Sequence, residues 1–199
     1  MDFREKNELY LAIPPTVFYT RTMSIWKQFY PDNYIDSTYQ IDFEQLKSQG
    51  IGGVIFDIDN TLVPHGAPAD ERSRALFLRL HKLGIQTMLL SNNKEPRVRS
   101  FAEQVHTSYI YKAGKPAVKN YRKAMELMGT DEKTTLFVGD QLFTDVWGAK
   151  RAGITNYLVK PIHPKEEIQI VLKRRLEWIV LYFYQKNLGK KEKGEGGRK

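Results

Sequence analysis

The feature that most constrains the fold is a regular alternation of short β-rich runs and helical patterns between residues 52 and 160. Between the β-rich runs, helical patterns cover residues 69–83, 96–104, 117–128 and 144–152. Strands joined by short helical connections favour a parallel sheet covered on both faces. With right-handed crossovers, the prediction is an α/β, doubly wound (Rossmann-like) sheet of about five strands. The predicted strands are Gly53–Phe56, Ile85–Leu90, Ser108–Tyr111, Thr134–Val138 and Asn156–Val159.

Glycine and proline mark where the predicted helices begin and end. Gly84, Gly129 and Gly153 each follow a helical stretch, where a left-handed residue commonly ends a helix. Pro96 and Pro116 stand where helices are expected to begin. The boundaries therefore agree with the hydrophobic pattern.

Composition bounds the class of protein. The chain has 199 residues, 41% of them hydrophobic, which suits one buried α/β domain with short extensions. It has no cysteine, so disulfides, thiolate metal sites and cysteine nucleophiles are excluded. The N-terminus does not have the pattern of a secretory signal, and no run reaches about 18 apolar residues. We expect a soluble protein, or one that rests on a membrane surface.

Four segments follow from the pattern. Residues 1–41 form an N-terminal lead with aromatic and aliphatic residues, and residues 42–163 form the core domain, opening with a short helix over 42–49. Residues 164–186 are expected to form an amphipathic helix, and residues 187–199 a disordered basic tail. The net charge is +8, and a basic tail favours an anionic partner.

The strongest local signal is the sequence Val54-Ile-Phe-Asp57-Ile-Asp59-Asn-Thr61. An apolar strand that ends in two carboxylates is costly unless these charges have a task. Because side chains alternate along a strand, Asp57 and Asp59 can project to the same side at its carboxyl end, where doubly wound sheets bind ligands. Paired carboxylates there can hold Mg²⁺, attack phosphorus or transfer a proton.

Three more motifs follow at the ends of successive elements. They are Met88-Leu-Leu-Ser91-Asn-Asn, Ala113-Gly-Lys115-Pro and Leu136-Phe-Val-Gly139-Asp140 with Asp145 five residues later. Taken singly, Asp59 reads as a turn cap, Ser91 as a helix N-cap and Lys115 as a surface lysine. Taken together, the motifs resemble the four motifs of the haloacid dehalogenase (HAD) superfamily, a specific combination.

The resemblance implies a magnesium-dependent phosphatase with a phospho-aspartate intermediate. Asp57 would be the nucleophile, Asp59 the general acid and base, and Thr61 would steady their loop. The phosphoryl oxygens would be held by Ser91, Asn92 and Lys115. The expected Mg²⁺ ligands are Asp57, Asp59 through its main-chain carbonyl, and Asp140, with Asp145 either a ligand or directly behind one.

The chain is expected to have no cap domain. The two usual insertion points span only about residues 62–69 and 112–114, so no lid would close over a small substrate. An open site suits a phosphate on a protein, a nucleic acid end or a lipid. Trp178–Tyr184 and Lys173-Arg174-Arg175 have the composition of a membrane-surface segment, although the same helix could pack on the core.

The order of motifs from about residue 9 to 185 resembles the YqeG family of HAD subfamily IIIA, which is similar to phosphatidylglycerophosphate phosphatases. This implies a cytoplasmic enzyme at the inner face of the membrane, acting on phosphatidylglycerophosphate. The expected partners are this phospholipid and an anionic membrane surface, with no nucleic acid and no obligate protein partner. Two alternatives stay open. One is a HAD phosphatase for a soluble nucleotide, sugar phosphate or phosphoprotein, and the other is a non-enzymatic RNA- or partner-binding protein.

Overall fold

The computed structural model describes residues 26–163 and 177–185. At its centre lies a six-stranded sheet with the order β1-β6-β5-β2-β3-β4, and every adjacent pair of strands is parallel. This confirms the predicted α/β, doubly wound sheet. The strands are β1 (Asn33–Ile35), β2 (Gly53–Phe56), β3 (Gln86–Leu90), β4 (Ser108–Ile110), β5 (Thr135–Gly139) and β6 (Thr155–Val159).

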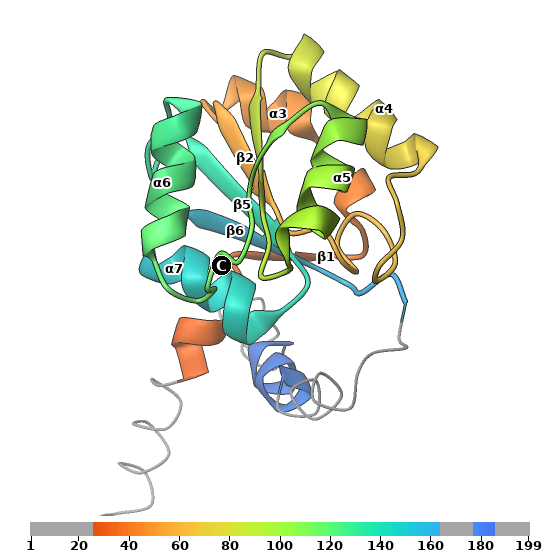
Figure 1. Ribbon diagram of the computed structural model, residues 1–199. Helices are drawn as coiled ribbons and strands as arrows, with labels where there is room; N and C mark the ends of the chain where they lie inside the picture. The colour runs from red at the N-terminus through yellow and green to blue at the C-terminus, as the bar shows by residue number, and fades with distance from the viewer. Residues whose placement is uncertain (1–25, 164–176, 186–199) are drawn as a thin grey trace, which may run out of the picture.

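Helices cover both faces of the sheet (Figure 1). One face carries α3 (Phe43–Ser48), α4 (Glu71–Lys82) and α5 (Glu95–Val105), and the other carries α6 (Lys119–Met128) and α7 (Trp147–Arg151). Shorter helical turns are η1 (Lys27–Phe29), η2 (Thr38–Gln40) and the π-helix η3 (Leu142–Val146).

The alternation of side chains along the strands divides the core in two. In β2, Val54 and Phe56 join the cluster beneath α3, α4 and α5, whereas Ile55 joins the cluster beneath α6 and α7. All four residues of β2 are buried, as expected for a central strand covered on both faces. The strand that leads to Asp57 is therefore the rigid middle of the domain.

The sheet has one strand more than the five that we predicted. The additional strand, β1, lies in the N-terminal lead and pairs with β6 in parallel, with Asn33 opposite Tyr157. Before it, the Asp32 carboxylate accepts hydrogen bonds from the Asn156 main chain at 3.0 Å and from its side chain at 2.6 Å. A three-residue strand is too short to show a periodic pattern, which is why the sequence did not reveal it.

The helix boundaries agree with the sequence, with two exceptions. Pro116, expected at the start of a helix, lies in a turn three residues before α6. Gly84, Gly129 and Gly153 all have positive φ angles of 66°, 67° and 78° and follow helices, as predicted. The helix predicted over 144–152 instead consists of the wider π-turns of η3, over 142–146, followed by α7. A hydrophobic pattern reports which face is buried and does not distinguish a π-turn from an α-turn.

Both HAD insertion points hold only short loops. One runs from the end of β2 to the start of α4, and the other from the end of β4 to the start of α6, so no cap lies there. Residues 177–185 are helical, whereas most of the predicted helix over 164–186 and the tail over 187–199 lie outside the described residues. Within the described ranges, no helix is long and apolar enough to cross a bilayer.

Candidate active site

The predicted site residues come together at the carboxyl edge of the sheet. Asp57 and Asp59 follow β2, Ser91 follows β3, and Asp140 follows β5. Since β2 lies between β3 and β5, the chain leaves β2 on one side and returns on the other. This is the switch point at which doubly wound sheets bind ligands. The loop after β4 carries Lys115 to the same edge of the sheet.

Lys115 is buried between two carboxylates. Its Nζ lies 2.7 Å from Asp57 Oδ1 and 2.7 Å from Asp145 Oδ1, and only 7% of the residue is exposed. The plain interpretation of Lys115 as a surface lysine is therefore wrong. A buried ammonium group beside the nucleophile can offset the negative charge of a phosphoryl group.

Burial and charge act on both members of this pair. Burial raises the pKa of Asp57 to about 6, Lys115 acts against this rise, and the Asp145 and Asp59 carboxylates add to it. Burial alone would lower the pKa of Lys115, but the carboxylates of Asp145 and Asp57 raise it above its usual range. Lys115 therefore stays protonated at neutral pH. Ionisation of Asp57 costs more free energy than ionisation of an exposed aspartate.

Asp57, Asp140 and Asp145 form a buried acidic cluster. Each offers a carboxylate oxygen, and these three oxygens lie within 4.8 Å of one another. Three buried carboxylates with a single lysine leave a net negative charge, which a divalent cation would balance. Hard cations such as Mg²⁺ prefer carboxylate oxygens, so the donor set fits such an ion. The side chain of Asp145 belongs to this cluster and also pairs with Lys115.

Three neighbours fix the position of Asp145. Its Oδ2 accepts a hydrogen bond from the Gln141 main chain at 3.1 Å. The buried Tyr121 hydroxyl donates to the carbonyl oxygen of Thr144 at 2.9 Å, one residue earlier on η3. A Cβ at Gly139 would lie 2.7 Å from the Cβ of Asp145, so only glycine leaves room for this side chain.

Asp59 follows the same strand but is held apart from the acidic cluster. Its Oδ1 accepts hydrogen bonds from the Gly66 main chain and from Arg97 Nη2, each at 2.8 Å, and its Oδ2 accepts one from the Asn93 amide. The carboxylate of Asp59 is not among the three clustered side chains. Its predicted part in metal binding through the main-chain carbonyl stays a prediction.

Asn93 and Arg97 were not predicted as site residues. Asn93 directly follows the predicted Ser91-Asn92 pair, and Arg97 lies in the first turn of α5. Both donate to the same carboxylate, Asp59. A cation one turn beyond the second motif was the available signal, because the start of that helix faces the carboxyl edge of the sheet.

The other predicted residues lie at the site with identifiable contacts. Ser91 is buried, and its Oγ accepts a hydrogen bond from the main chain of Asn93 at 3.3 Å. Asn92 contacts the main chain of Lys115, accepting at 2.8 Å and donating at 3.3 Å. Thr61 donates to Asp140 Oδ1 at 3.3 Å. Asn92 thus fixes the backbone of Lys115, and its predicted phosphate contact stays a prediction.

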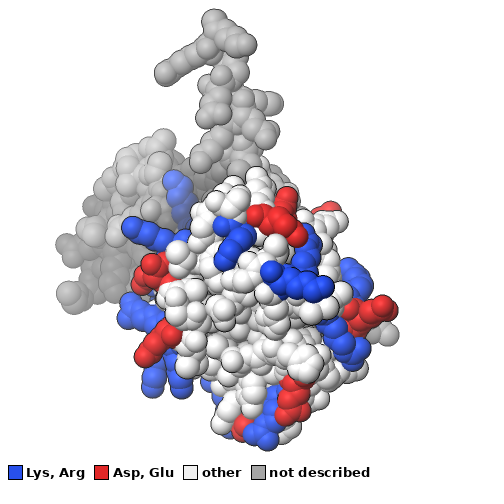
Figure 2. Space-filling view, turned by 90° about the horizontal axis from the view of Figure 1, so that it is seen from above, with Lys and Arg blue, Asp and Glu red and all other residues white. Residues whose placement is uncertain are grey.

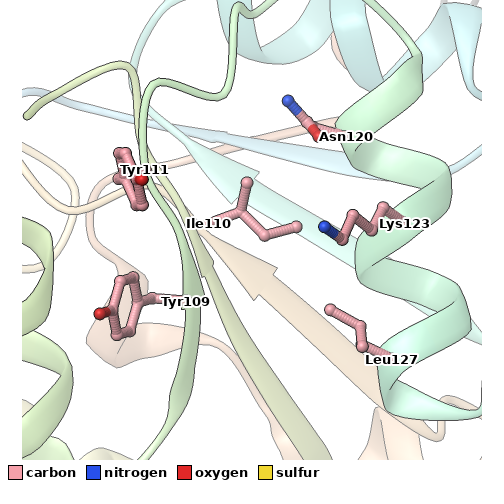
Figure 3. Close-up of a pocket in the computed structure, with 6 residues that line it drawn as sticks. All are labelled: Tyr109, Ile110, Tyr111, Asn120, Lys123 and Leu127. Atoms are coloured by element: carbon pink, nitrogen blue, oxygen red, sulfur yellow. The ribbon is translucent and has the colours of Figure 1, made fainter. Parts of the chain in front are cut away.

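One hollow lies beside the site and another lies away from it. A cavity of about 140 Å³ borders Asp140 and is lined by apolar side chains that include Leu142, Leu158, Trp178 and Leu181. A larger hollow of about 500 Å³ lies between β4 and α6. In Figure 3, Ile110 points toward the α6 side chains and Tyr109 and Tyr111 lie on the other side of the strand. No carboxylate lines it, so the acidic cluster belongs to a different part of the fold.

Comparison with known proteins agrees with this geometry. The family model of haloacid dehalogenase-like hydrolases matches residues 65–153. The Bacillus subtilis (strain 168) protein named "Probable phosphatase YqeG" is 35% identical over 156 residues, which are 78% of this chain and 91% of the relative. The Arabidopsis thaliana protein named "Phosphatidylglycerophosphate phosphatase 1, chloroplastic/mitochondrial" is 28% identical over 158 residues, 71% of this chain and 44% of that protein.

Among solved structures, the cobalt-bound deoxy-D-mannose-octulosonate 8-phosphate phosphatase from Haemophilus influenzae is similar to this chain. It has 16% identity and a TM-score of 0.45, covering 58% of this chain and 81% of that one. The similarity to the Bacillus subtilis protein extends over nearly the whole length of that protein. The chain belongs to the YqeG family of phosphatases within the haloacid dehalogenase-like hydrolases.

Proposed function

We propose that the chain hydrolyses the phosphomonoester of phosphatidylglycerophosphate through a phospho-aspartate on Asp57, with Mg²⁺ as cofactor. The observation that carries the chemistry is Asp57 itself, buried at the switch point beside Lys115 and the acidic cluster. The lipid is supported by the name of the Arabidopsis thaliana relative and by the apolar surface beside the site.

In this mechanism Asp57 forms the covalent bond. One of its carboxylate oxygens attacks phosphorus, and the bond from phosphorus to the leaving oxygen breaks. Asp59 gives a proton to that oxygen and later takes one from the water that hydrolyses the intermediate. Lys115 balances charge on the phosphoryl oxygens, and Ser91 can donate to them. Asp57, Asp140 and Asp145 would hold Mg²⁺, which would supply positive charge to neutralise the carboxylates and polarise the phosphate.

The open edge of the sheet favours a substrate that is presented on something large. Neither insertion point carries a lid, so water is not excluded by a closing cap. A phospholipid meets this condition because the bilayer itself covers the site when the headgroup is bound. The cavity beside Asp140 offers an apolar wall for the non-reacting part of such a molecule.

The helix over 177–185 supplies a candidate contact with lipid. It is tied to the site because Glu177 accepts a hydrogen bond from the main chain of Leu142 at 2.8 Å. On its outer side Trp178 is 68% exposed, and its ring stacks on that of the exposed Tyr182, with 6.0 Å between ring centroids. Trp and Tyr favour the membrane interface. We therefore propose a peripheral position at the cytoplasmic face of an anionic membrane.

One face of the domain lacks the charge pattern of a nucleic-acid site. On the face seen in Figure 2, Lys and Arg side chains alternate with Asp and Glu and do not form one basic patch. A nucleic-acid footprint usually gathers such residues on one surface. The basic residues near the exposed aromatic side chains in the sequence are Lys173, Arg174 and Arg175, which lie outside the described residues.

The decisive experiment measures phosphate release from anionic vesicles that contain phosphatidylglycerophosphate. Release is expected with Mg²⁺, not with EDTA, and not from the Asp57→Asn variant. Full activity of Asp57→Asn would refute the mechanism. A panel of soluble phosphate esters is run beside the lipid, and a large preference for a soluble ester would refute the lipid assignment while keeping the chemistry.

The membrane contact is tested with the double variant Trp178→Ala, Tyr182→Ala. We expect a several-fold rise in the vesicle concentration that half-saturates the enzyme, because two interfacial side chains are lost. The kcat on p-nitrophenyl phosphate should stay unchanged. Leu78→Ser is the matched control, since Leu78 is 56% exposed on α4. Equal vesicle dependence in all three proteins would contradict the proposed contact.

A further inference from the structure

Asp59 is held by groups from three different segments. The Gly66 main chain comes from the loop after β2, Asn93 from the loop after β3, and Arg97 from the first turn of α5. Arg97 lies 38 residues from Asp59 in the sequence, so the contact is set by the tertiary fold. Because the donors bind both oxygens, they fix the orientation of the Asp59 carboxylate as well as its position.

The hydrogen bonds occupy most of the acceptor sites of the Asp59 carboxylate. An ionised carboxylate has about four lone-pair sites, and three donors occupy three of them here. About one site therefore stays open for a further donor, and a water molecule fits this requirement. The same open site can carry the proton that Asp59 gives to the leaving oxygen in the first half-reaction.

The conformation of Arg97 leaves one of its hydrogen-bond donors without a partner. Its Nε is buried without a hydrogen-bond partner, the only such side-chain atom in the described part of the chain. An unsatisfied buried donor destabilises the folded state. The guanidinium group also lies 5.5 Å from the centre of the Phe101 ring, which helps to hold it on Asp59. Local costs of this kind are commonly found at functional sites.

We infer that Arg97 is a positioning residue that, together with Asn93, holds Asp59 to take the proton from the water that hydrolyses phospho-Asp57. This inference rests on the proposed phosphatase mechanism. In the step concerned, the water oxygen bonds to phosphorus and one water proton passes to Asp59. The bond between phosphorus and Asp57 breaks, its electron pair returns to the Asp57 carboxylate, and inorganic phosphate leaves.

The role predicts an unequal effect on the two half-reactions. With p-nitrophenyl phosphate the leaving group needs little protonation, so transfer to Asp57 depends weakly on Asp59. Hydrolysis of phospho-Asp57 requires that the Asp59 carboxylate is correctly placed and oriented to take a proton from the attacking water. Loss of Arg97 should therefore slow the second half-reaction more than the first, and the phosphoenzyme should accumulate.

The experiment compares the wild type with Arg97→Gln, Arg97→Lys and Arg99→Gln, using p-nitrophenyl phosphate and Mg²⁺. Arg99 is the matched control because it lies on the same helix, pairs with Glu95 and is 54% exposed. For Arg97→Gln we expect a steady-state rate about 10- to 100-fold lower, as for a misplaced catalytic group. A burst of about one nitrophenolate per enzyme and phosphoprotein after acid quench, seen by mass spectrometry, should accompany it.

Arg97→Lys should restore part of the hydrolysis rate, and Arg99→Gln should behave as the wild type. A fall in rate for Arg97→Gln without a burst or phosphoprotein would overturn the inference, as would an unchanged rate. Asn93→Ala removes the donor to Asp59 Oδ2 and should also make the phosphoenzyme accumulate. This variant tests the inference if Arg97→Gln fails to fold. A wild type without turnover on any ester would instead refute the proposed function.

Discussion

The ammonium nitrogen of Lys115 lies 2.7 Å from Asp57 Oδ1, and less than a tenth of either residue is exposed. The same nitrogen lies 2.7 Å from Asp145 Oδ1. Lys115 therefore links the end of β2 to η3 across the candidate site. Because these groups are buried, removal of Lys115 leaves two carboxylates that neither water nor protein balances.

Replacement of Lys115 by methionine is expected to destabilise the fold as well as stop catalysis. Two buried carboxylates lose their only common cation, and breaking such a buried pair costs about 3–5 kcal/mol. The loss should be largest near pH 8 and smaller near pH 5, because protonation of the carboxylates relieves their repulsion. Chemical denaturation in EDTA at both pH values measures it.

Lys119→Met serves as the control for this variant, since Lys119 is exposed at the start of α6. Its unfolding free energy should stay within about 0.5 kcal/mol of the wild type. A free energy of unfolding for Lys115→Met equal to that of Lys119→Met would show that the buried ion pair does not stabilise the domain.

Asp57→Asn should stabilise the metal-free protein at neutral pH. The folded pKa of Asp57 is about 6, above its ordinary value of 3.8. A group whose pKa is raised by folding contributes stability at low pH that is lost as the pH rises through the folded pKa. Ionised Asp57 thus costs stability above pH 6, by up to about 3 kcal/mol for two pKa units. Asparagine avoids this cost.

Thermal unfolding of both proteins in EDTA checks this expectation. The midpoint of Asp57→Asn should exceed that of the wild type at pH 8, and the advantage should vanish near pH 4. A variant that is less stable at pH 8 would mean that the attraction of Lys115 outweighs the burial of Asp57.

Addition of Mg²⁺ is expected to stabilise the wild type through the acidic cluster. Ligand at 100 times its dissociation constant adds about 2.7 kcal/mol to the free energy of unfolding. Asp140→Asn removes one of the three clustered carboxylates and should lose most of this gain. Asp36→Asn, which changes an exposed carboxylate paired with Lys160, should keep it. Equal shifts of the unfolding midpoint in both variants would place the ion elsewhere.

Much of the fold was predictable because its signals are local. The apolar runs, the glycines after helices and the carboxylates at strand ends each report on a few neighbouring residues. β1 could not be predicted, because its three residues are fixed by pairing with β6 and by the contact of Asp32 with Asn156. That information lies 124 residues away along the chain.

The site divides in the same way. Asp57, Lys115 and Asp140 lie in motifs whose spacing is visible in the sequence, and the structure brings them together. Arg97 lies outside the motifs, and its position one turn beyond the second motif is a weak signal, since an arginine in a first helical turn is usually a solvated side chain. Its role depends on the rotation of α5 against β2, which only the packed core determines.

Gly139→Ala is expected to disable the site while leaving the sheet intact. The new Cβ would lie 2.5 Å from Asp145 Oδ2 and 2.7 Å from its Cβ, too close for either atom to stay. Since Asp145 is held by Lys115 and by the Gln141 main chain, its displacement should weaken Mg²⁺-dependent stabilisation and lower kcat at least about 10-fold. Gly52→Ala is the matched control, because its Cβ would meet only ordinary contacts, the nearest at 3.7 Å. Circular dichroism and turnover of p-nitrophenyl phosphate measure the two effects, and wild-type turnover in Gly139→Ala would show that Asp145 can move without loss of the chemistry.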